Sequence, residues 1–130
     1  MNDSNRKSGQ KSRAQQAADL RRLIITSVRK IIDKEMAYLD PSFKITDLSA
    51  KIGVNRTYIS RYFNKELNTT FLDYVNALRV QKASNLILSG RRFSLTTICE
   101  RSGFSSGASY YRNFKKFTGM TPLEYRARNI

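Results

Sequence analysis

The chain has 130 residues, a length that suits one compact domain or two small lobes. Lysine and arginine number 24 against 10 aspartates and glutamates, and the net charge of +14 points to a polyanionic partner, most often nucleic acid. The chain has no histidine and one cysteine, which excludes histidine-based catalysis, histidine metal sites and an intrachain disulfide.

The chain begins with a polar segment followed by an amphipathic helix. Residues 1–19 are rich in Ser, Gln, Asn, Lys and Arg without apolar periodicity, which predicts a disordered linker in preference to a DNA-touching arm. Residues 20–38 show helical spacing, and the turn Asp40-Pro41-Ser42 ends the helix. The inward positions of this helix are Leu20, Ile24, Val28, Ile31, Ile32 and Glu35.

Residues 46–67 predict two short helices joined by a tight turn. The first helix covers 46–52, Gly53-Val54-Asn55 forms the turn with Asn55 as N-cap, and the second helix covers 56–67. Ile59 and Phe63 point to the core. This is the helix-turn-helix arrangement, whose second helix enters the major groove of DNA. The residues pointing away from the core are Thr57, Ser60, Arg61 and Asn64.

Residues 70–89 predict a long helix of about 30 Å. Its apolar stripe changes direction, which favours a linker that packs one lobe with its first half and another lobe with its second half, over a long helix buried in a single core. The helix length lies near the ~34 Å pitch of B-DNA, so two reading helices would enter successive major grooves. The first face carries Phe71, Tyr74, Val75 and Leu78, and the second carries Val80, Ala83 and Ile87.

The last third of the chain predicts a second helix-turn-helix. Ser94, Thr96 and Thr97 are alternative N-caps of a short helix, and a turn at Gly103 follows. The next helix stops at Gly119, and a capping box over 121–124 starts the last helix. The helix that stops at Gly119 has an inward stripe of Tyr110, Phe114 and Phe117. Ala108, Tyr111, Arg112 and Lys115 lie outside this stripe.

The two helix-turn-helix segments repeat one another in order. Leu48 and Gly53 recur 50 positions later as Ile98 and Gly103. Two copies are too few for a solenoid and suit a two-lobed reader. Ser49 and Cys99 occupy equivalent positions, so Cys99 is interpreted as a small packing residue, not as a reactive thiol. At a separation of 51, Arg61, Phe63, Lys65, Thr70 and Tyr74 match Arg112, Phe114, Lys116, Thr121 and Tyr125.

Residues 30–126 resemble the AraC/XylS family of bacterial transcription regulators. The resemblance implies an all-α fold of about seven helices, with helix-turn-helix lobes at 20–69 and 90–130 joined by a linker helix at 70–89. It also implies binding to double-stranded DNA and contact with RNA polymerase. The residues that carry it are Ile98-Cys99, Gly103-Phe104-Ser105, Tyr110, Arg112, Phe114-Lys115-Lys116, Gly119, Thr121-Pro122 and Tyr125-Arg126, with Arg79, Ala83, Leu86 and Ile87 in the linker.

The resemblance also suggests which residues read DNA. Arg61 and Arg112 are the strongest candidates, because arginine pairs bidentately with guanine; a phosphate contact or a solvated charge is the alternative for each. Gly107 and Ala108 have no polar side chain, so we expect the second lobe to read bases less sharply than the first. The family's base-reading positions fall on Thr57, Ser60, Arg61, Gly107, Ala108, Tyr111 and Arg112, and the expected phosphate contacts are Arg56, Lys65, Lys115 and Lys116.

These patterns predict a cytoplasmic, sequence-specific regulator of transcription that needs no cofactor or metal. The sequence has no phosphate-binding glycine loop or convincing carboxylate pair, which argues against an enzyme. It also has no apolar run of about 18 residues, which argues against membrane contact. A non-specific architectural nucleic-acid-binding protein and a helical module for an acidic protein partner remain as alternatives. The segment is expected to be a monomer and the C-terminal piece of a longer regulator, whose missing part would carry effector binding and oligomerisation.

Overall fold

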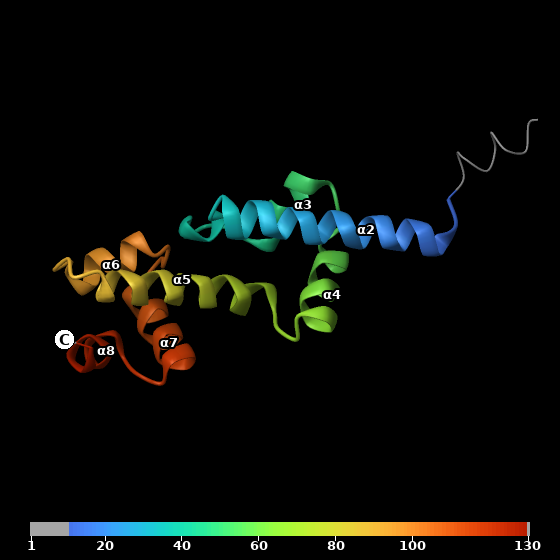
Figure 1. Cartoon of the computed structure of the whole chain (residues 1–130). Helices are drawn as coiled ribbons and strands as arrows, with labels where there is room; N and C mark the ends of the chain where they lie inside the picture. The colour runs from blue at the N-terminus through green and yellow to red at the C-terminus, as the bar shows by residue number, and fades with distance from the viewer. Residues whose placement is uncertain (1–10, 130) are drawn as a thin grey trace, which may run out of the picture.

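The computed structural model describes residues 11–129, and this part of the chain contains α-helices and turns without strands. The seven α-helices confirm the predicted all-α class (Figure 1). In chain order they are α2 (Arg13–Ser27), α3 (Ile45–Ile52), α4 (Arg56–Glu66), α5 (Phe71–Leu88), α6 (Leu95–Arg101), α7 (Gly107–Thr118) and α8 (Pro122–Arg128). A π-type helix η1 (Val28–Lys34) continues α2, and a 3₁₀ turn η2 (Ala37–Leu39) follows it.

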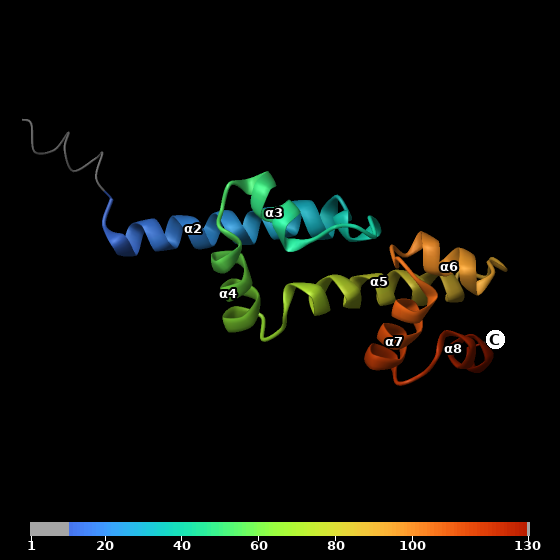
Figure 2. The same cartoon turned by 180° about the vertical axis from the view of Figure 1, so that it is seen from behind.

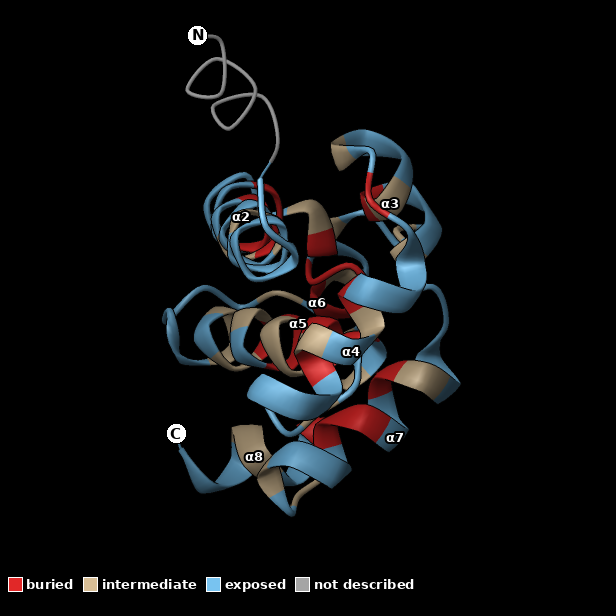
Figure 3. Cartoon of the chain, turned by 90° about the vertical axis from the view of Figure 1, so that its right-hand side faces the viewer, coloured by how far each residue is buried: buried red, intermediate tan, exposed pale blue. Residues whose placement is uncertain are grey.

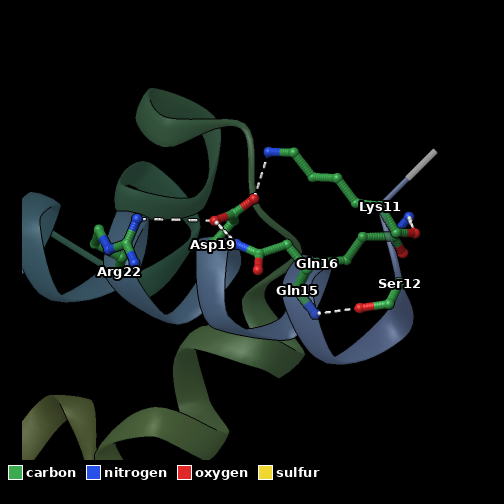
Figure 4. Close-up of polar contacts among 6 residues, drawn as sticks. All are labelled: Lys11, Ser12, Gln15, Gln16, Asp19 and Arg22. Atoms are coloured by element: carbon green, nitrogen blue, oxygen red, sulfur yellow. Dashed lines mark hydrogen bonds and ion pairs between the residues drawn. The ribbon is translucent and has the colours of Figure 1, made fainter. Parts of the chain in front are cut away.

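The first helix begins earlier than the sequence predicts. Ser12 is the N-cap of α2, since its hydroxyl accepts a hydrogen bond from the Gln15 amide at 3.1 Å. The Asp19 carboxylate accepts hydrogen bonds from the Gln15 side chain, at 3.2 Å, and from Lys11 (Figure 4). The prediction of disorder is therefore wrong for residues 13–19, where alanines and i,i+4 polar pairs favour a helix with an exposed surface. Residues 1–10 lie outside the described part of the chain.

The first helix also ends earlier than predicted. The Glu35 amide donates to the Lys30 carbonyl at 2.8 Å, a π-type i→i+5 bond, and Met36 then takes a left-handed conformation with φ of 56°. Tyr38 is consequently part of η2 and not of the helix. Glu35, which the periodicity placed on the inward face, is exposed, because the helix stops before its side chain can reach the core.

Two hydrophobic cores form, one in each lobe, and α5 contributes to both. Phe71 and Val75 lie in the first core, while Val80 and Ala83 lie in the second. The predicted rotation of the apolar stripe along this helix is thus confirmed. The buried positions lie mostly on the inward faces of the helices (Figure 3). The first core contains Ile24, Val28, Ile31, Ile32, Tyr38, Leu48, Val54, Ile59 and Phe63, and the second contains Ile98, Cys99, Phe104, Tyr110 and Phe114.

Helix α5 sets the distance between the lobes. Thr70 caps it by accepting a hydrogen bond from the Asp73 amide at 3.0 Å, and Ser89 ends it. Its 18 residues give a length of about 27 Å at roughly 1.5 Å per residue. Helix α4 lies at the N-terminal end of α5, and α7 lies beneath its C-terminal half in both views (Figures 1 and 2).

The second core ends at Phe114, one turn sooner than predicted. Phe117 is 39% exposed, so its assignment to the inward stripe of α7 is wrong. Helix α8 closes the core at Phe114 instead: the Tyr125 ring packs edge-on against Phe114, with centroids 5.3 Å apart, while Phe117 stays outside this contact. No helix within residues 11–129 combines the length and the apolar character needed to cross a membrane.

Candidate nucleic-acid interface

The exposed face of α4 gathers the polar residues predicted for the first lobe. Gly53 adopts φ of 69° in the turn before α4, and Asn55 caps the helix by accepting from the Thr57 amide at 2.8 Å. Ile59 and Phe63 are fully buried beneath the helix and fix its rotation. One shallow hollow beside α3 is lined by Ile45, Arg56, Thr57, Ser60, Arg61, Asn64 and Lys65. All five residues predicted to contact DNA from this lobe therefore lie together on one surface.

Helix α7 presents the equivalent face of the second lobe. Ser106 caps it by accepting from the Ser109 amide at 3.1 Å, and Tyr110 and Phe114 are buried beneath it. The predicted residues Gly107, Ala108, Tyr111, Arg112, Lys115 and Lys116 are all exposed.

The hollow beside α7 differs in charge from the one beside α4. Its lining includes Gly107 and Tyr111 from α7 and Thr96 and Glu100 from α6. Glu100 is the only Asp, Glu, Lys or Arg among the described residues that line it, whereas the first hollow carries two arginines and a lysine. The two lobes therefore offer DNA different surfaces despite their common fold.

Residues 48–128, more than half of the chain, match a family described as a helix-turn-helix domain, and this family is of the AraC type. This chain belongs to the AraC-type helix-turn-helix family. Members of the family are DNA-binding transcription regulators, and the match runs from within α3 to the end of α8, so that it includes α4, the linker helix and the second lobe.

Relatives of this AraC-type domain include much longer regulators. An uncharacterised HTH-type transcriptional regulator of Staphylococcus aureus is 31% identical over 99 residues, which cover 76% of this chain and 13% of the relative. The C-terminal domain of a two-component response regulator from Fusobacterium nucleatum is 32% identical, with a TM-score of 0.68 over 76% of this chain and 93% of that domain. An AraC-type regulator structure from Chromobacterium violaceum shares the fold at 24% identity, with a TM-score of 0.68 over 86% and 96% of the two chains.

Tyr58 lies beside the predicted DNA-contacting residues of α4 but was not predicted as one of them. Tyr58 is 48% exposed on α4, with its ring centroid 5.9 Å from the guanidinium carbon of Arg61. It also lines a groove between α4 and α2, together with Leu20, Arg21 and Arg61. A large aromatic residue outside the apolar stripe of α4 was the signal that could have found it.

Lys116 already has a partner in this structure. Its ammonium group donates to the Asp73 carboxylate of α5 at 2.8 Å, and the ion pair is partly exposed. A phosphate contact by Lys116 would have to replace or share this partner. Lys115 is exposed on the same turn of α7.

Ser49 and Cys99 are both packing residues beneath the recognition helices. The Ser49 hydroxyl donates to the Val54 carbonyl at 2.5 Å, and the Cys99 thiol lies 3.6 Å from the Ser106 carbonyl oxygen. Burial raises the pKa of the Cys99 thiol above its usual value, which disfavours the reactive thiolate.

Among the three predicted candidates, Ser94 is the N-cap of α6. Its hydroxyl accepts a hydrogen bond from the Thr97 amide at 3.0 Å.

The Tyr110 hydroxyl is buried in the second lobe without a hydrogen-bond partner among the described residues. Burial also raises the pKa of Tyr110. Because an unsatisfied buried hydroxyl costs about 1–3 kcal/mol, Tyr110→Phe should raise the free energy of unfolding by about 1 kcal/mol. Denaturant unfolding followed by circular dichroism measures this change.

Tyr74→Phe is the matched control, with the opposite sign. The Tyr74 hydroxyl donates to the Asp33 carboxylate at 2.8 Å, so this variant should lose about 1–2 kcal/mol. A loss of stability in Tyr110→Phe equal to that in Tyr74→Phe would show that the Tyr110 hydroxyl has a partner in solution.

Proposed function

We propose that this domain binds specific double-stranded DNA sequences by placing α4 and α7 in successive major grooves, and thereby regulates transcription. The observation that carries the proposal is the placement of the two exposed recognition helices near the two ends of a common linker helix (Figure 2). A linker of about 27 Å, with a recognition helix packed at each end, suits the ~34 Å that separates adjacent turns of the major groove.

The first lobe supplies most of the base recognition in this proposal. Arg61 reads guanine through its two terminal nitrogens, while Thr57 and Ser60 hydrogen-bond neighbouring base edges. Arg56 and Lys65 flank them in the same hollow and bind phosphates. These roles follow from the shared surface, from the exposure of Arg61 and from its cationic surroundings.

The second lobe supplies a looser contact. Arg112 reads a base, and Tyr111 makes apolar contact with thymine methyl groups, because Gly107 and Ala108 bring no polar side chain. Lys115 and Lys116 bind phosphates, the latter by giving up its contact with Asp73. We therefore infer an asymmetric binding site, sharply defined under α4 and less so under α7.

The partners follow from this function. The domain acts in the cytoplasm on double-stranded DNA and is a monomer by itself, and its family implies contact with RNA polymerase. It performs no catalysis and needs no cofactor or metal for DNA binding.

Binding to selected and random DNA at several salt concentrations tests the proposal. Sites are first selected from random duplexes and sequenced. With about 6–10 phosphate contacts, the slope of log K against log[salt] should be about −5 to −9. The selected site should bind about 10³-fold or more tightly than random DNA.

Other results would indicate other functions. Affinities for selected and random DNA within a few-fold of each other would indicate a non-specific architectural protein. A slope shallower than about −2 would argue against binding to the DNA backbone. No DNA binding at any salt concentration would favour a module for an acidic protein partner.

A further inference from the structure

Arg79 is a buried arginine in the middle of α5, with 5% of its surface exposed. Its Nε donates to the Tyr38 carbonyl at 2.7 Å, and a terminal nitrogen donates to the Asp40 carbonyl at 3.0 Å. The other terminal nitrogen donates to the Asn76 side chain at 3.0 Å. Burial lowers the pKa of Arg79 and the nearby Asp40 raises it, but an arginine remains charged in proteins. This charge is therefore held by the backbone of residues 38–40.

The second lobe contacts the same stretch of backbone. Gly103, in the turn between α6 and α7, has φ of 91° and packs directly against residues 38 and 39. A Cβ atom at this position would lie 2.9 Å from the Leu39 Cα and would collide with the Tyr38 carbonyl oxygen. We call residues 38–40, together with Asn76, Arg79 and Gly103, the interlobe joint.

The joint connects parts of the molecule that differ in role. Residues 38–40 follow the first helix and belong to the first lobe, whereas Gly103 lies in the turn that joins α6 to the recognition helix α7 of the second lobe. Arg79 holds the first-lobe side of this contact through two directed hydrogen bonds, and charge-assisted bonds of this kind are stronger than neutral ones. Loss of the guanidinium would remove the Arg79 donor from the Tyr38 carbonyl and would leave the Asp40 carbonyl with the Phe43 amide, which donates to it at 3.1 Å. The surface on which Gly103 packs would then be held less firmly.

We propose that Arg79 is a positioning residue, which fixes the separation and rotation of α4 relative to α7 and thus sets the spacing that the domain accepts between its two half-sites. The part of this proposal that concerns DNA rests on the function proposed above. A purely structural role would lower stability or overall affinity, while a positioning role changes the preference for spacing.

The first test varies the DNA spacer. Duplexes carry the selected site with 1 or 2 bp added or removed between the half-sites. Each base pair shifts one half-site relative to the other by about 3.4 Å and rotates it by roughly 35°. The wild-type protein should bind the shifted sites at least about tenfold more weakly than the selected site. In Arg79→Ala this ratio should fall at least about threefold, with a smaller fall in Arg79→Lys, which retains the charge but not the fork of donors.

Two further variants keep the spacer test decisive. Lys82→Ala removes a positive charge one turn along α5 and should keep the wild-type ratio, because Lys82 is outside the joint. If Arg79→Ala does not fold, judged by circular dichroism, Arg79→Lys and Asn76→Ala carry the test. An unchanged ratio in folded Arg79 variants, even with lower overall affinity, overturns the proposal.

The second test requires no DNA. Spin labels are attached at Ala50→Cys on α3 and at Glu100→Cys on α6, in a Cys99→Ser background. Pulsed electron paramagnetic resonance then gives the distribution of distances between the two lobes. The distribution should be narrow with Arg79 present and at least about twofold wider in the Arg79 variants, and equal widths overturn the proposal. A wild-type protein without any spacing preference, but with a narrow distribution that Arg79→Lys broadens, would contradict the two-groove function while supporting the joint.

Discussion

Replacing Gly103 by alanine should destabilise the protein by about 2–5 kcal/mol. The left-handed backbone of this residue costs an alanine about 1–2 kcal/mol. The added Cβ also meets the backbone of residues 38 and 39, and overpacking of this kind costs about 1–3 kcal/mol more. Denaturant unfolding measures the loss, and DNA affinity should fall with it because the collision displaces one lobe from the other.

Gly53→Ala is the matched control. Gly53 occupies the equivalent turn of the first lobe, with φ of 69°, but a Cβ there would have no neighbour within 4 Å among the described residues. This variant should therefore show the backbone cost alone, about 1–2 kcal/mol. If both alanine variants lose the same stability, the packing of Gly103 against the first lobe does not persist in solution.

Replacing Arg61 by alanine should weaken binding to the selected DNA site by about 1–3 kcal/mol, or roughly 5- to 150-fold. The preference at one or two base pairs under the first lobe should disappear with it, since the bidentate contact is lost. Arg112→Ala should cost a similar amount of affinity but flatten the base preference less. Binding of each variant to duplexes mutated at every base pair measures both effects.

Arg61→Lys separates base reading from phosphate binding. Lysine retains the positive charge but not the planar fork of donors that matches guanine. If Arg61 reads a base, the lysine variant should lose the preference while retaining the salt dependence; if Arg61 binds a phosphate, the lysine variant should resemble the wild type. A binding site that is more stringent under α7 than under α4 would contradict the argument from side chains, and DNA shape would then be the first explanation to examine.

Local chemistry made much of the fold predictable. The capping box at Thr121 and Glu124, the N-cap Asn55 and the turn glycines each depend on residues close in sequence, and the structure has them as expected. The rotation of the stripe along α5 predicted the two cores, because inward positions on a helix follow from its period.

The features that the sequence did not reveal depend on distant contacts. The position of Phe117 was misjudged because α8 completes the core before that residue is reached. The contact between Lys116 and Asp73 joins residues 43 positions apart, and the bonds of Arg79 to the backbone of residues 38–40 span about as many. A period along one helix carries no information about such partners.

The sequence predicted which residues line the candidate site better than it predicted the acidic and aromatic residues around them. The helical period of residues 56–67 predicted that Thr57, Ser60 and Arg61 point away from the core residues Ile59 and Phe63, and they do line one hollow. The acidic Glu100 beside α7 and the aromatic Tyr58 beside Arg61 were not expected, since their exposure depends on how α2 and α6 pack against the recognition helices.

Footprinting of the protein on its selected DNA tests the central claim most directly. Because one linker helix fixes both recognition helices, hydroxyl-radical cleavage should show two protected segments, centred about 10–10.5 bp apart, on one face of the duplex. The two half-sites should differ in sequence, since the two lobes present different side chains. A single protected segment, another separation, or strictly inverted half-sites under a monomer would contradict the placement of α4 and α7 in successive major grooves.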